Sequence, residues 1–304
     1  MSVDILILSN GPGEVTTWVR PVVQALRQQL GEDRDKVRIS VVLSPCPNAT
    51  GKECAIASSY PQVDRVQSAE HFFPFLLSGK TAQNWDWRDQ GIVLFLGGDQ
   101  FYTVIIGKRL GYRTVVYAEW DARWHNWIDR FGIMKSEIAA KAAPKYADKF
   151  TVVGDLMAEA TTQDLSQLPI TDNPLPTELI GLLPGSKPAK LAQGVPLCLA
   201  IAQRIQAVRP QTRFVIPVAP TLDLKILARF ADRNQNPLIQ QFGWESAELI
   251  VPANSDSPYF KTPAGLRVEL FTQFPAYDLL SQCRLCLTTV GANTAELGSL
   301  AVPM

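Results

Sequence analysis

Short apolar runs alternate along the chain with segments whose apolar residues recur at helical spacing. The valines and leucines at positions 15, 19, 22, 23, 26 and 30, for example, fall on one helical face. Alternation of this kind is typical of an α/β protein. The strands predicted in the first half are Val3–Leu8, Val37–Leu43, Ile92–Leu96, Thr114–Ala118, Ile128–Met134 and Phe150–Val153. Because these runs are almost continuously apolar, we expect parallel sheets covered by helices on both faces.

The pattern is interrupted once and then restarts. Residues Gln163–Glu178 are rich in proline and turn-forming residues and show no period, which predicts a linker. The elements predicted after it are strands Leu179–Leu183, Arg213–Val218, Arg267–Phe271 and Arg284–Thr289 and helices Leu191–Val208, Leu222–Asp232 and Tyr277–Ser281. The polar stretch Asn234–Gly265 shows neither the helical period nor the alternation of a strand. We therefore expect two Rossmann-like, doubly wound domains, residues 1–165 and 176–304, that face a cleft to which each contributes loops.

Composition narrows the class of protein. Of the 304 residues, 46% are hydrophobic and 19% charged, enough apolar material for two domains of ordinary size. The 29 basic and 29 acidic residues cancel, which argues against a partner bound through nucleic-acid phosphates. No apolar run reaches the roughly 20 residues needed to span a bilayer, and the first residues read as a strand rather than as a signal peptide.

The cysteines and histidines limit the chemistry. Five cysteines show no framework spacing, and Cys283 and Cys286, the single C-x-x-C pair, lie in an apolar run. We interpret them as core thiols rather than as a redox or zinc pair, and expect a reduced, cytoplasmic protein. With only two histidines, neither a Ser-His-Asp triad nor a histidine-ligated metal site is expected, and no cofactor is predicted.

Two glycine-containing loops follow predicted strands in the first half. In Ser9–Glu14, glycines at positions 11 and 13 allow a ligand to approach the backbone closely. The loop lacks the G-x-G-x-x-G pattern, so support for a dinucleotide site is weak, and an ordinary tight turn is an equal alternative. In Gly97–Gln100, Asp99 stands at the end of a strongly apolar strand. It is a candidate general base or, alternatively, the N-cap of the next helix.

Two further loops follow strands in the second half. Leu183–Lys187 offers backbone donors, a hydroxyl and the charge of Lys187 to a phosphate, although an exposed turn is an equal alternative. In Val290–Glu296 we predict that Asn293 or Thr294 caps a helix whose first N–H groups point at an anion. Glu296, expected in its first turn, is suited to accept hydrogen bonds from a ribose diol. Because no partner strand follows this βα unit, we also expect the second domain to be incomplete at its C-terminus.

Aromatic residues gather in two segments of the first half. Phe72–Leu77, with Trp85 and Trp87, would form a membrane-docking patch if exposed, but aromatic residues at such spacing more often pack in a core. The second segment contains Trp120, Arg123, Trp124, His125 and Trp127. Its rings and charges are suited to flank a cleft that binds an acceptor molecule.

Six motifs carry a resemblance to a known family. They are Gly11-Pro-Gly-Glu14, Gly98-Asp99, Val116-Tyr-Ala-Glu-Trp-Asp-Ala-Arg-Trp124, Val153-Gly-Asp-Leu-Met-Ala158, Leu182-Leu-Pro-Gly-Ser-Lys187 and Gly291-Ala-Asn-Thr-Ala-Glu-Leu297. In this order, along nearly the whole chain, they resemble the lipid-A-disaccharide synthase family, inverting glycosyltransferases of the two-domain GT-B fold. The Leu-Leu-Pro-Gly-Ser-Lys motif is the most specific, because the family has Leu-Leu-Pro-Gly-Ser-Arg. The last motif is also similar to a loop of the peptidoglycan enzyme that adds N-acetylglucosamine.

The resemblance implies transfer of a sugar from a UDP-sugar to a glycolipid-like acceptor, with peripheral contact to the inner face of the membrane. The donor-binding residues that it implies are Gly185, Ser186, Lys187, Gly291, Ala292, Asn293, Thr294 and Glu296. The residues that it implies on the acceptor side are Gly11, Gly13, Glu14, Trp120 and Arg123. Asp99 would deprotonate the attacking hydroxyl.

The chain also departs from the family pattern. Lys187 replaces the family's arginine, which keeps the charge but loses the bidentate fork. The first loop lacks the family's Ser-Gly-Asp, and the tryptophan-rich run is only partly kept. Two alternatives therefore stay open: a UDP-sugar 2-epimerase, which shares the fold and the donor loop, and a catalytically silent relative that binds a nucleotide sugar or a lipid.

Overall fold

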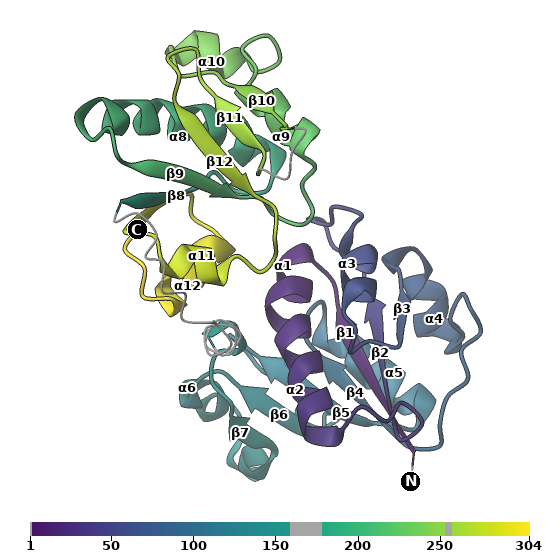
Figure 1. The fold of residues 1–304 in the computed structure, drawn as a ribbon. Helices are drawn as coiled ribbons and strands as arrows, with labels where there is room; N and C mark the ends of the chain where they lie inside the picture. The colour runs from purple at the N-terminus through teal and green to yellow at the C-terminus, as the bar shows by residue number, and fades with distance from the viewer. Residues whose placement is uncertain (1, 159–177, 253–256) are drawn as a thin grey trace. The chain divides into compact units, whose positions relative to one another are not determined.

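The computed structural model describes residues 2–158, 178–252 and 257–304 (Figure 1). The chain divides into two compact units, Met1–Ala160 and Thr161–Met304. The predicted linker lies almost entirely outside the described residues. The domain limits 1–165 and 176–304 therefore stay a prediction.

The first unit is built on a seven-stranded sheet in the order β3-β2-β1-β4-β5-β6-β7, with every neighbouring pair parallel. Its strands are β1 (Val3–Ser9), β2 (Val37–Leu43), β3 (Arg65–Gln67), β4 (Gly91–Phe95), β5 (Arg113–Ala118), β6 (Arg130–Ile133) and β7 (Phe150–Val152). Six of the seven confirm predicted strands with ends shifted by at most two residues, whereas β3 was not predicted. The strand order reverses between β1 and β4, and open α/β sheets bind ligands beyond the carboxyl ends of strands at such a point.

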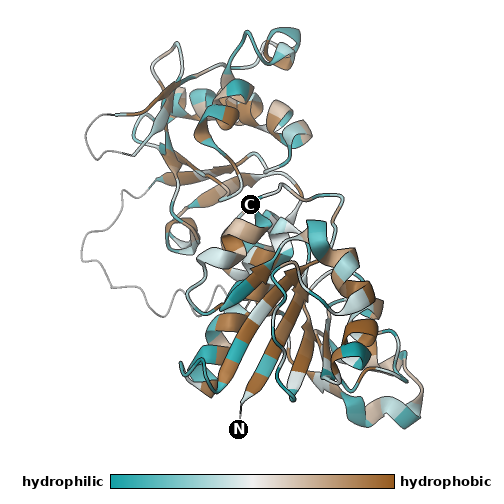
Figure 2. Cartoon of the chain, turned by 90° about the vertical axis from the view of Figure 1, so that its right-hand side faces the viewer, coloured by the Kyte–Doolittle hydropathy of each residue, from teal (hydrophilic) through white to brown (hydrophobic). Residues whose placement is uncertain are grey.

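Helices cover both faces of this sheet because successive side chains of a strand point to opposite sides. Ile5 and Ile7 pack on one side against the valines of the first helix. Leu6 and Leu8 pack on the other side against Phe72. The helices of this unit are α1 (Pro12–Glu14), α2 (Arg20–Leu30), α3 (Glu53–Ser59), α4 (Phe72–Ser78), α5 (Gln100–Leu110) and α6 (Ser136–Ala140). The mainly hydrophobic colour of the strands in Figure 2 agrees with burial on both faces.

The first helix contains a π-helical turn that its periodicity did not predict. α1 continues through this turn, Val15–Val19, into α2. The hydroxyls of Thr16 and Thr17 donate to the carbonyl of Gly13 at 3.0 and 2.8 Å. Such turns are frequent at functional sites, and this one follows the first candidate loop directly.

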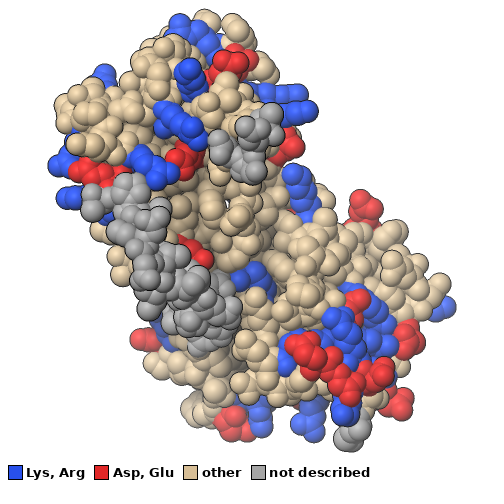
Figure 3. Space-filling view, in the orientation of Figure 1, with Lys and Arg blue, Asp and Glu red and all other residues tan. Residues whose placement is uncertain are grey.

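Charged residues at the amino end of the first sheet have a structural role. Asp4 is fully buried and accepts hydrogen bonds from Arg38 Nε at 2.7 Å and the Tyr112 hydroxyl at 2.8 Å. Burial acts to raise the pKa of Asp4, but these donors and the Arg88 N–H hold it below its usual value. Figure 3 shows acidic and basic side chains interspersed on part of this unit. The Asp4 cluster lies at the opposite end of β1 from the candidate loops.

The second unit contains a six-stranded sheet in the order β10-β11-β12-β9-β8-β13. Its strands are β8 (Leu179–Leu183), β9 (Arg213–Pro217), β10 (Glu248–Ile250), β11 (Tyr259–Lys261), β12 (Arg267–Phe271) and β13 (Leu285–Thr288). Its helices are α8 (Pro188–Val208), α9 (Leu224–Ala231), α10 (Pro237–Phe242), α11 (Tyr277–Ser281) and α12 (Ala292–Ser299). All eight elements predicted in this half are present, including the helix after Val290, which is α12.

One edge of the second sheet differs from the expected parallel arrangement. β12, β9, β8 and β13 are parallel, but β10 and β11 run antiparallel and extend the sheet beyond β12. They account for part of the stretch to which the sequence assigned no structure. On the parallel part, α8 and α9 cover one face and α11 and α12 the other. Cys283 and Cys286 are buried in the latter core, which confirms that they are core thiols.

Candidate functional site

Three loops meet at the carboxyl ends of β1, β2 and β4, where the strand order of the first sheet reverses. Gly98 has φ +105°, and a Cβ there would lie 2.6 Å from Ser44 Oγ. A Cβ on Gly97 would lie 2.9 Å from Asn10 Oδ1. Only glycine is compatible with this close approach and this backbone. The glycine pair therefore allows the loops to converge at the position where α/β sheets bind ligands.

The predicted acceptor-side residues of the first loop belong to this convergence. Gly11 is the N-cap of α1, and a Cβ on it would lie 2.5 Å from Glu14 Oε2. Glu14 also reaches the second loop, since a Cβ on Gly97 would lie 3.1 Å from Glu14 Cγ. No atom lies within 4 Å of a Cβ built on Gly13, whose carbonyl binds the threonine hydroxyls of the π-helical turn. The structure thus brings Gly11 and Glu14 to the loop that contains Asp99.

Asp99 has the capping role that the sequence offered as an alternative. It is the N-cap of α5, and its Oδ1 accepts a hydrogen bond from the Phe101 N–H at 2.9 Å. Its side chain is nevertheless 49% exposed. Arg123 Nη2 lies 3.9 Å from Asp99 Oδ1, so the structure brings these two predicted residues together. A cap of this kind leaves carboxylate oxygen accessible, and the role of Asp99 as a base stays a prediction.

Gln100 holds the loop that carries Arg123. It is buried, its Nε2 donates to the Asp121 carbonyl at 2.9 Å, and its Oε1 accepts from the Arg123 N–H at 2.8 Å. A single buried amide therefore fixes the loop after β5 against the start of α5. Neither contact is visible in the sequence, where Gln100 looks like an ordinary first helical residue.

Glu119, directly after β5, is a titratable group that the sequence analysis did not select. Burial raises the pKa of Glu119, and the nearby charges of Asp155 and Glu14 raise it further, against a hydrogen bond from Trp120 that lowers it. A carboxyl group with a raised pKa at a strand end is a candidate proton donor or acceptor. The sequence offered one signal for Glu119, namely its position directly after a predicted strand. Asp99 has a similar position in the loop after β4.

The tryptophan-rich segment forms a partly exposed aromatic surface beside Arg123. Trp120 is 73% exposed. The ring of Trp124 lies between Phe101, at a centroid distance of 4.5 Å, and Trp127, at 5.5 Å. Trp124 has φ +64°, which is uncommon outside glycine and more frequent at functional sites. The segment is therefore held in a defined shape next to the Asp99 loop.

Most side chains of the first aromatic segment are buried in the core, so the membrane-docking patch that the sequence suggested is smaller than the whole segment. Phe72 and Phe75 are fully buried, and Trp85 and Trp87 pack against the same cluster. Phe73 and Leu77 are the exposed large apolar residues of α4, at 52% and 73%, and they lie four residues apart on one helical face. A role of Phe72 in docking to a membrane is therefore excluded by its burial.

In the second unit, the two predicted donor loops lie side by side. β13 pairs with β8 so that Thr288 is opposite Leu183, and the loops that follow both strands begin at the same edge. Gly185 has φ +98°, and a Cβ on it would lie 3.0 Å from Lys190 Cβ. The Lys190 ammonium donates to the carbonyl of Val290, and lies 3.3 Å from the position of a Cβ on Gly291. Lys190 thus connects the loops and was missed by the sequence analysis.

The start of α12 differs from the prediction. The N-cap is Gly291, not Asn293 or Thr294, and the Thr294 hydroxyl donates back to the Gly291 carbonyl. Asn293 and Thr294 are therefore the second and third helical residues, and Glu296 lies in the second turn. At the start of α8, Lys187 is the N-cap and Ser186 is exposed. α8 thus begins directly after the Gly185 loop, and α12 begins directly after Gly291.

No helix among the described residues is long and apolar enough to cross a membrane. No group of three or more histidine, cysteine, aspartate or glutamate side chains among them is arranged to hold a metal ion.

Comparison with known proteins gives local sequence similarity. No protein-family model matches the chain. A lipid-A-disaccharide synthase of Anaeromyxobacter sp. (strain K) is 48% identical over 44 residues, which are 14% of this chain and 12% of that protein. A lipid-A-disaccharide synthase of Geobacter sulfurreducens is 26% identical over 126 residues, 41% of this chain and 25% of that protein. The matched segments thus span at most a quarter of these relatives.

Solved structures with a similar fold cover nearly the whole chain. The UDP-GlcNAc 2-epimerase from Neisseria meningitidis bound to UDP-GlcNAc has a TM-score of 0.54 at 14% identity, over 99% of this chain and 81% of that one. A 2-epimerase structure from Listeria monocytogenes also gives 0.54, at 13% identity over 100% and 78% of the two chains. The two α/β units, with sheets dominated by parallel strands, therefore have the GT-B fold. At these identities the similarity shows the fold alone.

Proposed function

We propose that the chain acts as a glycosyltransferase that moves a sugar from a UDP-sugar to a hydroxyl of a glycolipid-like acceptor, as lipid-A-disaccharide synthases do. The observation that carries the proposal is the meeting of the Gly185 and Gly291 loops at Lys190, at the starts of α8 and α12. Two helix N-termini and a lysine at one place suit a diphosphate, because backbone N–H groups and a positive charge converge there. The local similarity to two synthases supports the same conclusion.

The proposed reaction is a displacement at the anomeric carbon. The acceptor oxygen forms a bond to this carbon while the bond to the UDP oxygen breaks, and the acceptor proton passes to the Asp99 carboxylate. An inverting reaction requires the base and the leaving group on opposite faces of the sugar. Donors at Gly185, Ser186, Lys187 and Lys190 would stabilise the negative charge that develops on UDP.

The remaining predicted residues have binding roles in this proposal. The backbone of residues 291–294 would hold the diphosphate, and Glu296 would accept hydrogen bonds from the ribose. The acceptor would lie against the first unit, at Gly11, Gly13, Glu14, Trp120 and Arg123. The exposed Phe73 and Leu77 would give the apolar contact with the membrane in which a glycolipid acceptor resides.

One observation favours a second enzymatic function, a UDP-sugar 2-epimerase. Inversion at C2 requires acid and base groups but no acceptor. Glu119, with its raised pKa, and the half-exposed Asp99 provide two such groups after neighbouring strands. The aromatic surface at Trp120 has no role in an epimerase, which favours the transferase. The third alternative, a silent protein that binds a nucleotide sugar or a lipid, predicts binding without turnover.

Two measurements separate these functions. Isothermal titration of the full chain with UDP comes first, and absence of binding at millimolar UDP would contradict both enzymatic functions. Incubation with UDP-GlcNAc in deuterated water, without acceptor, follows. Deuterium at C2 identifies an epimerase, whereas sugar transfer to a glycolipid acceptor without C2 exchange supports the transferase. UDP binding with neither product identifies a silent relative.

A further inference from the structure

A second candidate binding site lies in the second unit, at the opposite edge of the sheet from β13. It is a pocket of about 770 Å³ formed by α9, the residues after it, β10 and the end of β11. This volume lies within the range of small-molecule sites, roughly 300 to 1,000 Å³. The pocket shares no lining residue with the loops at Gly185 and Gly291. It therefore requires an explanation separate from the donor.

Four basic side chains surround this pocket. Lys225, Arg229 and Arg233 follow one another at intervals of four residues, and Lys261 ends β11. Within the part of the chain that the structure describes, none of these four cations has an acidic partner within 4.0 Å. Lys225 and Arg229 lie four residues apart on α9, where like charges repel each other, whereas Arg233 follows the end of this helix. A bound anion would reduce this repulsion.

Two acidic residues also line the pocket, and they neutralise the cations only in part. The Asp232 carboxylate accepts hydrogen bonds from the Asn234 N–H at 2.8 Å and Gln235 Nε2 at 2.7 Å. Glu248 stands opposite Lys261 in the β10–β11 register. Among the described residues that line the pocket, four cations and two carboxylates leave an excess of two positive charges.

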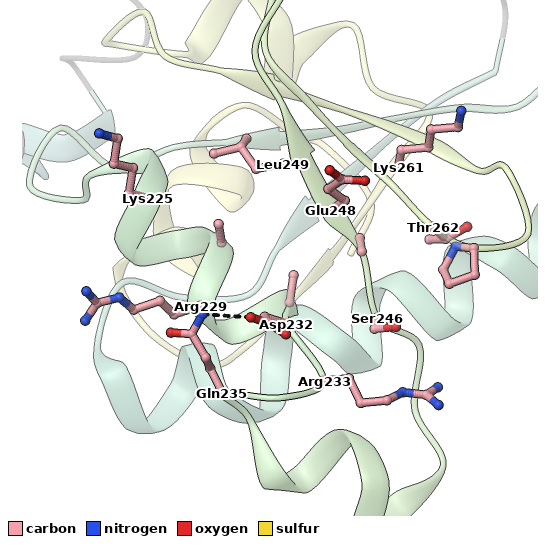
Figure 4. A pocket seen from close by; sticks show the side chains of 14 residues that line it. Lys225, Arg229, Asp232, Arg233, Gln235, Ser246, Glu248, Leu249, Lys261 and Thr262 are labelled. Atoms are coloured by element: carbon pink, nitrogen blue, oxygen red, sulfur yellow. Dashed lines mark hydrogen bonds between the residues drawn. The ribbon is translucent and has the colours of Figure 1, made fainter.

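The cations lie on different sides of the pocket, and their charged ends point outward, away from one another. Figure 4 shows Lys225 and Arg229 on one side, Arg233 and Lys261 on the other, and Glu248 between them. The pocket wall between the charges includes Ala231 and the polar side chains of Ser246 and Thr262, all three buried. A ligand with an anionic group at each end of a polar body matches this distribution.

We propose that this pocket binds a small, soluble polyanion, such as a sugar or nucleoside that carries at least two phosphate charges. The concave shape favours a compact solute over the flat surface of a lipid bilayer. The site is distinct from the proposed donor loops and does not depend on the function assigned to them. The Ala247 N–H already donates to the Ala231 carbonyl at 2.9 Å, which joins the end of α9 to the segment before β10, and a bound ligand would add contacts across this junction.

The test is isothermal titration of the full chain with pyrophosphate and with glucose 1,6-bisphosphate. The wild type should bind at least one probe, and an Arg229→Ala/Arg233→Ala variant should bind it at least tenfold more weakly. Glu248→Gln should bind about threefold more tightly, because it removes the negative charge between the cations. Arg204→Ala, which removes an exposed cation of α8 outside the pocket, is the matched control and should leave the affinity unchanged. All these side chains are exposed, so the variants should fold, which circular dichroism checks.

Several outcomes would overturn the proposal. These are no binding of either probe, an equal loss in Arg204→Ala, or unchanged affinity in the double variant. Flotation with phosphatidylglycerol vesicles is a separate experiment that tests binding to a lipid surface. Vesicle binding that requires Arg229 and Arg233, without binding of the soluble probes, would assign the cations to a lipid surface and reject the soluble ligand. Lys190→Met separates this site from the donor loops, since it should weaken UDP binding and leave the probes unaffected.

Discussion

The Lys190 ammonium donates a hydrogen bond to the carbonyl of Val290, a hundred residues further along the chain. This contact joins the first turn of α8 to the loop that precedes α12. Both loops follow neighbouring parallel strands, so the sheet places them together and Lys190 fixes their spacing. The same ammonium group lies next to Gly291, at the start of the second helix. Lys190 therefore both stabilises the candidate donor site and contributes a charge to it.

Replacing Lys190 should weaken UDP binding. Lys190→Met removes the charge and the hydrogen bond to Val290 but keeps the length of the side chain. We expect about a tenfold loss of affinity, about 1.4 kcal/mol, in an isothermal titration. Lys190→Arg keeps the charge and should recover part of the loss, while Arg204→Ala on the same helix should bind like the wild type. Equal UDP affinity of Lys190→Met and the wild type would show that the lysine has only a packing role.

Two glycine variants should change stability in opposite directions. A Cβ on Gly194 would lie 2.5 Å from the Pro184 carbonyl oxygen, so Gly194→Ala must push the donor loop away from α8 and should cost about 1–3 kcal/mol. Gly298, in α12, has no atom within 4 Å of such a Cβ, so Gly298→Ala should stabilise by about 0.5–1 kcal/mol. Calorimetric unfolding measures both. A stable Gly194→Ala variant with normal UDP affinity would contradict the close packing of this loop.

Two substitutions of Asp99 separate its roles as cap and as base. Asparagine caps helices about as well as aspartate, so Asp99→Asn should unfold within about 0.5 kcal/mol of the wild type. It cannot accept the proton, and sugar transfer should fall at least about 100-fold. Asp99→Ala should lose the same activity and, in addition, about 1 kcal/mol of stability. Transfer by Asp99→Asn at the wild-type rate would leave Asp99 with the capping role alone.

Most of the fold could be predicted because the core strands are long, apolar runs. β3, β10 and β11 were missed because each has only three residues and one of the three is charged, whereas β7, which is equally short, has no charged residue. β10 and β11 also pair antiparallel at the sheet edge, where alternation gives no continuous apolar run. The π-helical turn in the first helix was hidden because its buried valines fit ordinary helical spacing equally well.

The candidate site could be predicted only as far as it consists of loops after strands. Propensity favours Asn293 and Thr294 as caps, but the extended backbone at Gly291 starts α12 earlier and Thr294 binds back to it. Lys190 looks like any solvated helical lysine until β8 and β13 are known to be neighbours. Glu119 owes its raised pKa to burial and to Asp155 and Glu14, both far away in the sequence. These residues become functional candidates only through tertiary contacts.

The raised pKa of Glu119 predicts a pH-dependent stability. A carboxyl group with a higher pKa in the folded than in the unfolded protein binds more protons when folded, so its contribution lowers stability as pH rises from about 4.5 through the raised value. Glu119→Gln has no such group. Its stability relative to the wild type should therefore be greater at pH 8 than at pH 4, as measured by urea unfolding at both values. A difference that does not change with pH would show that Glu119 has an ordinary pKa.

The exposed pair on α4 should account for any binding to membranes. Phe73 and Leu77 share one helical face and are well exposed, whereas Phe72 is fully buried one residue away. In flotation with phosphatidylglycerol vesicles, Phe73→Ser/Leu77→Ser should lose most of the bound fraction, because the apolar contact is removed. Its unfolding free energy should stay within about 0.5 kcal/mol of the wild type, as expected for surface changes.

Phe72→Ala is the matched control for that experiment. It removes a core ring and should cost about 3–5 kcal/mol of stability, but it leaves the exposed pair in place. At a temperature where this variant is still folded, its flotation should equal that of the wild type. Equal flotation of the Phe73→Ser/Leu77→Ser variant and the wild type would remove α4 from the proposed membrane contact. The acceptor would then have to be delivered to the aromatic surface at Trp120 without docking through this helix.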